Sequence, residues 1–360
     1  PLVGHLDPEF IRLMEETKTL LRSVFQTTNP LTLPVSGTGS AGMETCFVNL
    51  IEPGDEVLIG VNGVFGTRMV DVVERCGGKP VTMQAPWGQV FTSDDVRSAL
   101  KRCQQPKLVA VVHAETSTGA WQPLEEISAL VHQAGALFLV DAVTSLGGCP
   151  LKVDDWKIDV CYSGTQKCLS CPPGLSPITF SSAAQDVLRS RTHKVQSWYL
   201  DLTMLEKYWG EERVYHHTAP ISMNYALREA LRLVLEEGLE ARFRRHERNH
   251  LALAAGLDAL GMQLAAQEGR RLWMLNSVTI PDGVDEAAIR QELLAEYNIE
   301  IGAGLGAFKG KVWRIGLMGE SSTRSNVLLV LSALEAVLQK HGHRCPTGAG
   351  LRAAQEVYAA

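Results

Sequence analysis

The chain has 360 residues, a net charge of −6 and 45% hydrophobic residues, which is enough for two domains with a large core. The negative charge and the lack of a basic stripe argue against a nucleic-acid partner, and no apolar run is long enough to span a bilayer. There is no secretory signal, and the chain starts with Pro1 instead of methionine, which indicates a trimmed or missing beginning.

The first half of the chain alternates between helical and strand-like segments. Apolar residues recur at helical spacing over residues 9–25, which predicts a helix. Helical or polar segments separate most of the short apolar runs that follow, and this alternation is typical of an α/β fold with a mostly parallel central sheet and helices on both faces. The runs are 31–35, 57–61, 80–83, 108–112, 137–140, 158–161 and 178–180.

After about Ser182, helices and loops replace the strands. Gly238 separates two expected helices and marks the domain boundary, and a smaller α+β domain is expected beyond it. The sequence therefore predicts a large domain over 1–238, a small domain over 239–340 and a loosely held tail over 341–360. Within these parts, helices are expected at 221–237, 239–260 and 325–341, and strands at 273–280, 299–301 and 312–315.

The clearest chemical signal lies at the ends of two predicted strands. Asp141 ends the apolar run 137–140, and Lys167 follows the run 158–161 after a stretch of small, polar residues. An amine and a carboxylate at neighbouring strand ends suit pyridoxal phosphate, because the amine condenses with the cofactor's aldehyde and the carboxylate pairs with its protonated ring nitrogen. Considered alone, a lysine after a strand is usually a solvated surface charge, and an aspartate there is often only a turn or helix-cap residue.

A glycine-rich turn follows the first predicted strand and precedes a helix. Gly37, Gly39 and Gly42 match the dinucleotide fingerprint, so a nicotinamide-dependent oxidoreductase is the alternative from another class. That fingerprint expects an acidic residue at the end of the next strand, where Asn62 stands. A single cofactor phosphate suits the turn equally well, because free N–H groups converge there and Thr38 adds a hydroxyl, and a tight turn without a ligand also fits.

Further candidate residues follow other strands at the edge where α/β sheets bind ligands. Phe65 lies between glycines after the second strand, where a flat ligand could stack, and Thr116 belongs to a cluster of hydroxyls after the fourth. Arg314 lies inside an apolar strand and needs a carboxylate partner, which is either a structural Asp or Glu or a substrate.

Cysteine and histidine patterns predict no metal site. Several of the eight cysteines lie in apolar segments, which suggests packed thiols in a reducing compartment. Cys168 and Cys171 form a Cys-x-x-Cys pair, but no second pair follows at zinc spacing. Tandem His216 and His217 are interpreted as part of a solvated turn. The C-terminal alanines are no peroxisomal address, so a cytoplasmic location is the default expectation.

With these residues assembled, nearly the whole chain resembles the alanine–glyoxylate and serine–pyruvate aminotransferases, which are class-V, fold-type I pyridoxal-phosphate enzymes. The resemblance implies a transaminase that moves an amino group from a small amino acid, alanine or serine, to glyoxylate or pyruvate in two half-reactions. It rests on segments 25–32, 36–39, 116–119, 141–148, 163–167, 172–174, 215–218 and 314–316.

The resemblance also implies roles for single residues. Lys167 would hold the cofactor and then carry a proton between substrate and cofactor, Asp141 would hold the ring nitrogen, and Arg314 would clamp the substrate carboxylate. Tyr215 and Thr218 would reach the phosphate of a neighbouring subunit, which implies a homodimer with shared active sites. The other implied cofactor contacts are phosphate binding by Thr38, Gly39 and Gln166, ring contacts by Phe65, Thr116 and Val143, and Ser40 beside them.

The chain departs from these relatives in two ways. Their Gly-Pro-Gly-Pro segment, which helps to form the substrate mouth, would precede Pro1 and is absent, and some of them have histidine at the position of Ser40. Same-fold transaminases of ureidoglycine, 3-hydroxykynurenine or an aminophosphonate remain alternatives. A cysteine desulfurase is disfavoured because the only late cysteine is Cys345, and a cofactor-binding regulator would need a fused partner-binding domain, which is not visible.

Overall fold

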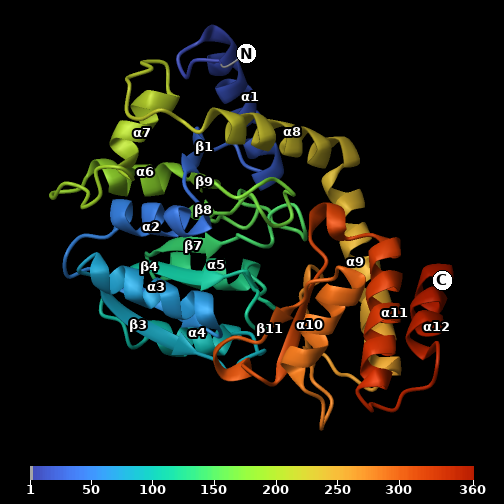
Figure 1. Cartoon of the computed structure of the whole chain (residues 1–360). Helices are drawn as coiled ribbons and strands as arrows, with labels where there is room; N and C mark the ends of the chain where they lie inside the picture. The colour runs from blue at the N-terminus through green and yellow to red at the C-terminus, as the bar shows by residue number, and fades with distance from the viewer. Residues whose placement is uncertain (1–2) are drawn as a thin grey trace.

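Residues 3–360 are described by a computed structural model. They form two packed units that α8 (Ile221–Glu237) and α9 (Leu239–Ala259) join (Figure 1). The larger unit has a central sheet with helices on both faces, and the smaller unit has a short sheet covered by helices. Among residues 3–360, none of the helices combines the length and the hydrophobicity of a membrane-spanning segment. The helices up to the junction are α1 (Pro8–Phe25), α2 (Gly39–Leu50), α3 (Val64–Arg75), α4 (Ser93–Leu100), α5 (Glu125–Gln133), α6 (Ser182–Arg189), α7 (Leu202–Trp209) and α8 (Ile221–Glu237).

The large sheet is mostly parallel, as the sequence predicted. Its strand order is β1-β9-β8-β7-β4-β2-β3, and only β9 runs antiparallel to both of its neighbours. Each strand falls on one of the seven apolar runs. The bounds are β1 (Leu31–Ser36), β2 (Glu56–Val61), β3 (Lys79–Gln84), β4 (Pro106–Val112), β7 (Leu137–Asp141), β8 (Val160–Tyr162) and β9 (Leu175–Phe180).

The central strands separate two hydrophobic cores. In β4, Leu108 and Ala110 belong to the core that packs under α2 and α3, whereas Val109 and Val111 belong to the core under α4, α5 and α8. Because both faces of the sheet are covered, a central strand is apolar at successive positions instead of alternating with polar residues. This burial explains why the strands were visible in the sequence as continuous apolar runs.

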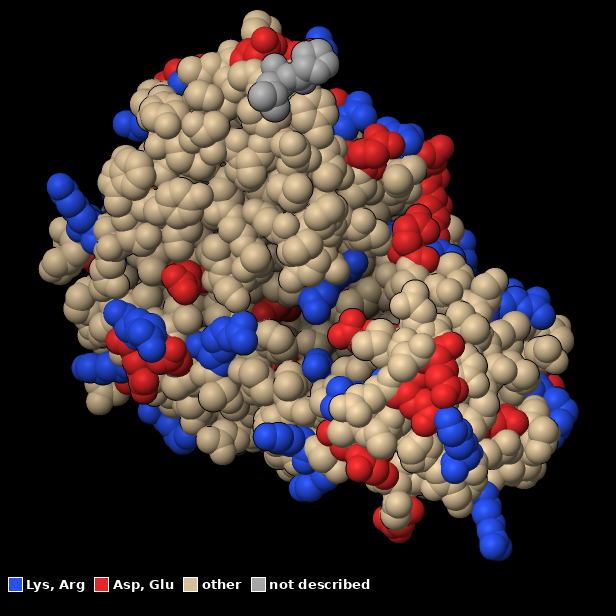
Figure 2. Space-filling model, in the orientation of Figure 1, with Lys and Arg blue, Asp and Glu red and all other residues tan. Residues whose placement is uncertain are grey.

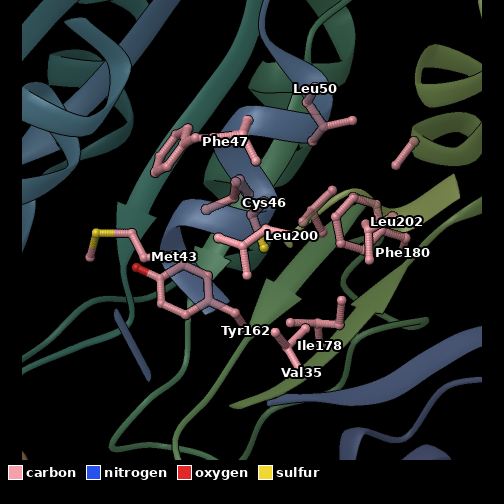
Figure 3. Packing of buried hydrophobic residues seen from close by; sticks show 14 of the residues in the cluster. Val35, Met43, Cys46, Phe47, Leu50, Tyr162, Ile178, Phe180, Leu200 and Leu202 are labelled. Atoms are coloured by element: carbon pink, nitrogen blue, oxygen red, sulfur yellow. The ribbon is translucent and has the colours of Figure 1, made fainter. Parts of the chain in front are cut away.

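Helix α2 lies against the end of β8 and so places its amino terminus beside the sheet edge. Figure 3 shows Met43 and Cys46 of this helix packed near Tyr162 of β8. Gly42 allows the close approach, because a Cβ atom there would overlap the hydroxyl of Ser176 on β9. The glycine therefore serves helix–sheet packing, which is one role of the third glycine in the fingerprint.

The strand register brings the key residues to one edge. Strands β7 and β8 are parallel neighbours in which Asp141 is paired with Tyr162, the last residue of each strand. The chain then leaves β8 through residues 163–167, so Lys167 lies beyond the same edge as Asp141. Parallel strands end on one side of a sheet, and this is the side where open α/β sheets bind ligands.

The smaller unit has a hydrophobic core of its own, which residues between 252 and 354 form. Residues 299–301 were predicted to be a strand, but pairing starts later, because α10 ends at the left-handed Asn298 and the chain must first extend toward β12. The elements are α9 (Leu239–Ala259), α10 (Glu286–Tyr297), α11 (Arg324–Lys340) and α12 (Ala349–Ala359), with an antiparallel sheet of β10 (Leu275–Thr279), β12 (Val312–Gly316) and β11 (Gly302–Ala303).

The prediction of a loose tail over residues 341–360 was wrong. Residues 349–359 form α12, which packs on α9 and α11 and buries Ala354 in the core of the smaller unit. The Tyr358 hydroxyl donates a 2.7 Å hydrogen bond to Asn249 Oδ1 on α9. This helix was not predicted because the segment is rich in small residues, although Leu351, Ala354 and Tyr358 recur at helical spacing.

Candidate active site

A cavity of ≈ 130 Å³ lies at the edge where β7 and β8 end. It gathers nine residues that the sequence had singled out: Thr38, Gly39, Ser40, Phe65, Thr116, Asp141, Val143, Gln166 and Lys167. Other residues that line it were not predicted: Met43, Arg68, Val112, Ala114, Thr144 and Tyr162.

Asp141 is a buried carboxylate at the base of this cavity. Its Oδ2 accepts a 2.7 Å hydrogen bond from the Tyr162 hydroxyl, and its Oδ1 accepts a 2.8 Å bond from the Val143 N–H. Burial raises the pKa of Asp141 to about 6, although these hydrogen bonds oppose the shift. A buried carboxylate that lacks a cationic partner is destabilised, so this position favours a ligand that brings a positive charge. Tyr162 was missed because its hydroxyl is paired only through the strand register.

Lys167 is half-buried and its side chain lines the same cavity. Burial lowers the pKa of Lys167, and the positive charge of Arg314 lowers it further. An amine with a lowered pKa is more often unprotonated, which is what a nucleophile or a general base requires. Its neighbours Cys168 and Cys171 are buried free thiols, and burial raises the pKa of Cys168 to about 12.

The amino terminus of α2 forms a narrow cradle against the segment before Lys167. The Thr38 hydroxyl makes no capping bond to the helix, and backbone pairing within α2 starts with the Ala41 N–H. A Cβ atom on Gly39 would lie 3.1 Å from Val143 Cγ2, and one on Gly164 would lie 2.9 Å from Gln166 Oε1. Free N–H groups, a hydroxyl and space beside glycines are what a phosphate needs at a helix amino terminus.

Glu115 holds one wall of the cavity. It lies in β5 (Ala114–Glu115), which pairs with β6 (Ala120–Trp121) in a short hairpin that the sequence did not predict. Its carboxylate accepts hydrogen bonds from the Phe65 N–H at 3.2 Å and from the Ser117 hydroxyl at 2.6 Å. Phe65 is thereby oriented in the first turn of α3. Arg68, one turn later, lies 5.0 Å from the Phe65 ring and donates a 3.2 Å bond to the Ser40 hydroxyl.

Arg314 approaches the cavity from β12 of the smaller unit. Its Nε donates to Ala303 O at 2.8 Å and its Nη1 to Thr116 O at 3.4 Å. No carboxylate of the described chain forms an ion pair with it, and burial lowers its pKa. The structure therefore does not support a structural Asp or Glu as the partner of Arg314. Its guanidinium remains available to the carboxylate of a substrate.

Tyr215 and Thr218 do not reach this cavity within their own chain. Both side chains are exposed, and Tyr215 is 60% accessible. His216 and His217 between them are not a solvated turn as predicted: His216 is buried and stacks on Trp198 at 4.4 Å, and His217 bonds the Ser36 hydroxyl at 2.7 Å.

The residues of the cavity fit pyridoxal phosphate better than a dinucleotide. The buried carboxylate matches the ring nitrogen, the half-buried amine matches the aldehyde, and the glycine cradle at α2 matches a single phosphate. At the end of β2, Asn62 is buried and donates to Gln89 O at 2.9 Å, so that strand end holds no carboxylate for a ribose.

Comparison with known proteins supports this interpretation. The sequence profile of the class-V aminotransferases matches residues 2–324. The solved alanine–glyoxylate aminotransferase of Nostoc sp. is 53% identical with a TM-score of 0.92, over 94% of this chain and 89% of that one. The ureidoglycine–glyoxylate aminotransferase structure from Bacillus subtilis is 46% identical with a TM-score of 0.97, over 100% and 93%. The alanine–glyoxylate aminotransferase of Callithrix jacchus is 42% identical, over 96% of this chain and 83% of the relative.

Proposed function

The chain belongs to the class-V aminotransferases, and we propose that Lys167 and Asp141 make it transfer amino groups from a small amino acid to glyoxylate. It is a pyridoxal-phosphate-dependent transaminase of fold type I. The observation that carries the proposed roles is the placement of an amine of lowered pKa and a buried carboxylate at the adjacent ends of β8 and β7.

Different residues around the cavity would bind the phosphate, the ring face and the ring nitrogen of the cofactor. Thr38, Gly39 and Gln166 would bind its phosphate at the α2 amino terminus, and Phe65 would stack on its ring. When bound, pyridoxal phosphate supplies an aldehyde that condenses with amines and a ring that withdraws electrons from the substrate Cα. Asp141, held by Tyr162, would keep the ring nitrogen protonated, because a buried carboxylate strongly favours a cationic partner.

Lys167 would then move the proton on which the reaction depends. Because burial and the charge of Arg314 lower its pKa, the Lys167 amine is more often unprotonated, and it would take the proton from the substrate Cα and hold it for return. Its half-buried position in the cavity would keep the amine close to the substrate Cα, so the proton would be transferred within one site. The same residue would serve both half-reactions.

Arg314 would bind the α-carboxylate of both substrates. We expect Arg314→Ala to raise the KM for L-alanine about 10- to 100-fold, because a charge-assisted hydrogen bond contributes about 1.5–3 kcal/mol. Steady-state kinetics with L-alanine and glyoxylate measure this, with Arg270→Ala, an exposed arginine before β10, as the matched control. An unchanged KM in Arg314→Ala would refute the carboxylate role.

The donor is the least constrained part of the proposal. Glyoxylate is named as a substrate in the relatives from Nostoc sp. and Bacillus subtilis, whereas their donors are alanine and ureidoglycine. Serine as donor and pyruvate as acceptor are the further candidates, and Ser40 with Arg68 leaves a polar wall where some relatives carry histidine.

A visible absorption spectrum of the purified holoenzyme tests the function directly. L-alanine, L-serine and ureidoglycine are added one at a time, and glyoxylate or pyruvate follows. The donor should bleach the band of the lysine-bound cofactor and the acceptor should restore it. A band that no donor bleaches would refute the transaminase assignment for these donors, and failure to bind the cofactor at all would refute the site.

We also propose that the active unit is a homodimer. Figure 2 shows a broad area with few charged side chains over the part of the molecule that holds α6 and α7 in Figure 1. Large apolar side chains are exposed in the segments that precede and follow α7 in the chain, namely Trp198, Tyr199, Val214 and Tyr215. Exposed apolar patches of this kind mark interaction surfaces, and the reach of Tyr215 and Thr218 into a second subunit's site would explain why they lie outside their own.

Val214→Glu is expected to weaken the dimer by more than about tenfold, because a charge would be buried without a partner. Leu251→Glu on α9 is the matched control, since the two side chains are 49% and 50% exposed. Analytical ultracentrifugation over a concentration series measures the dissociation constants. A wild-type monomer at all concentrations, or equal effects of both substitutions, would contradict the proposed surface.

A further inference from the structure

Arg242 connects the two loops that carry the proposed catalytic residues. It lies in the first turn of α9 and is only 3% exposed. Its Nε donates a 3.0 Å hydrogen bond to Gly147 O, and its Nη2 donates a 2.6 Å bond to Cys168 O. Gly147 lies on the segment that leaves Asp141, and Cys168 directly follows Lys167. One guanidinium thus connects the backbone segment that follows Asp141 to the backbone segment that follows Lys167.

Glu237 extends this connection to the smaller unit. Its carboxylate accepts a 2.5 Å bond from Arg242 Nη1 and a 2.6 Å bond from Arg245 Nε. Arg245 Nη1 in turn donates to Gly319 O at 2.9 Å and to Ser322 O at 2.6 Å. These two carbonyls belong to the turn that follows β12, the strand of Arg314. The two arginines hold the pKa of Glu237 down at about 2 against the effect of burial, so the carboxylate stays ionised.

The same turn touches the loop after Lys167 from the other side. The Glu320 N–H donates a 2.8 Å bond to the Ser170 hydroxyl. Gly319 has a φ of 57°, and a Cβ atom there would overlap the Ser170 hydroxyl and lie 2.9 Å from Cys168 O. The loop of Lys167 is therefore held between α9 and the smaller unit, with no space for a larger residue at position 319.

Resting on the proposed transaminase function, we propose that Arg242 is a positioning residue for Lys167. It sets the distance of the lysine from Asp141, and through Glu237 and Arg245 it ties both loops to the end of the small sheet where Arg314 lies. A planar guanidinium is suited to this task because it donates to two carbonyls and one carboxylate at fixed angles, whereas a lysine ammonium keeps the charge without that geometry.

The test uses Arg242→Lys in the holoenzyme and follows single half-reactions by the absorption of the bound cofactor. We expect the limiting rate of the L-alanine half-reaction to fall about 10- to 100-fold, since a displacement of about 1 Å at the reacting groups costs that much. The apparent dissociation constant of L-alanine should change far less, because Arg314 remains. The midpoint of the pH titration of the cofactor band should also move, since it reports the surroundings of Lys167.

Arg232→Lys on α8 is the matched control, because Arg232 pairs with Glu229 and Glu236 at the surface and touches neither loop. It should leave the rate and the titration midpoint at wild-type values. Glu237→Gln provides a second route if Arg242→Lys does not fold, because it preserves the bonds from Arg242 to both carbonyls. Glu237→Gln should shift the titration midpoint in the same direction as Arg242→Lys does, with a smaller loss in the limiting rate of the L-alanine half-reaction.

The possible failures are distinguishable. If wild-type holoenzyme shows no half-reaction with any donor, the proposed function fails, and this inference fails with it. If the wild type reacts and Arg242→Lys reacts at the same limiting rate with an unshifted midpoint, only the positioning role is overturned. A lower thermal midpoint with unchanged kinetics would mean that Arg242 is merely structural, which also overturns the proposal.

Discussion

Lys167→Ala is expected to lower the rate of transamination by more than about 10³-fold while the protein still folds. The residue would both hold the cofactor and move the proton at the substrate Cα, and general acid–base catalysis alone contributes about 10²–10⁴-fold. Its side chain is half-buried and makes no ion pair within the described chain, so its loss breaks no salt bridge there. The measurement is the rate of glyoxylate-dependent loss of L-alanine, with circular dichroism as the check on folding.

Lys152→Ala is the matched control, because this lysine is partly exposed, lies 3.9 Å from Asp155 and is not among the residues that line the cavity. It should retain the wild-type rate. In Lys167→Ala the cofactor should still bind through the phosphate cradle and ring contacts, but without the absorption band of the lysine-bound form. Turnover within tenfold of wild type would remove the central claim about the site.

Asp141→Asn is expected to have opposite effects on turnover and on stability. The pKa of Asp141 in the folded, cofactor-free protein is about 6, above the ordinary value of 3.8, so the folded state holds its proton more tightly than the unfolded state. Stability should therefore fall as the pH rises from about 4 to about 6, by up to about 3 kcal/mol, and stay low above that range. Asparagine carries no charge, so cofactor-free Asp141→Asn should be more stable than wild type at pH 8 and should lose the advantage at pH 4.

The same substitution should reduce turnover by more than about 100-fold. The ionised carboxylate would keep the cofactor ring protonated, and a buried charge-assisted hydrogen bond contributes about 3 kcal/mol. Urea unfolding of the cofactor-free proteins at pH 4 and pH 8 tests the first effect, and the spectroscopic half-reaction tests the second. If wild type and Asp141→Asn had the same stability difference at both pH values, or if the variant had near-normal turnover, Asp141 would not be a destabilised buried carboxylate that binds the cofactor's cationic ring nitrogen.

Tyr162→Phe separates the charge of Asp141 from its orientation. This change removes the 2.7 Å bond to Oδ2 and leaves the carboxylate and the Val143 bond in place. We expect a loss of about tenfold in the half-reaction, below that of Asp141→Asn, since a hydrogen bond to a charged group contributes about 1.5 kcal/mol or more and the carboxylate charge itself remains.

Much of the fold could be predicted because burial on both faces leaves a direct trace in the sequence. The strands of the large sheet appear as apolar runs, and α1, α8, α9 and α11 appear as helical spacing near their observed bounds. The β5–β6 hairpin was missed because each strand has two residues and pairs only after Gly119 closes the turn. Helix α12 was missed because it consists largely of small residues with a weak apolar pattern. Its burial becomes evident only from its packing against α9.

The chemical groups at the sheet edge could be identified from the amino-acid sequence. Asp141 and Lys167 follow recognisable strands, and the glycine-rich turn before α2 has the form of a phosphate site, because local spacing is enough to place residues at strand and helix ends. The contacts between these groups, in contrast, depend on how distant segments pack in three dimensions. Strand register paired Tyr162 with Asp141, and the hairpin brought Glu115 to Phe65. The packing of the smaller unit left Arg314 without a carboxylate partner among residues 3–360. These contacts join residues far apart in the chain, and no periodicity within one segment encodes them.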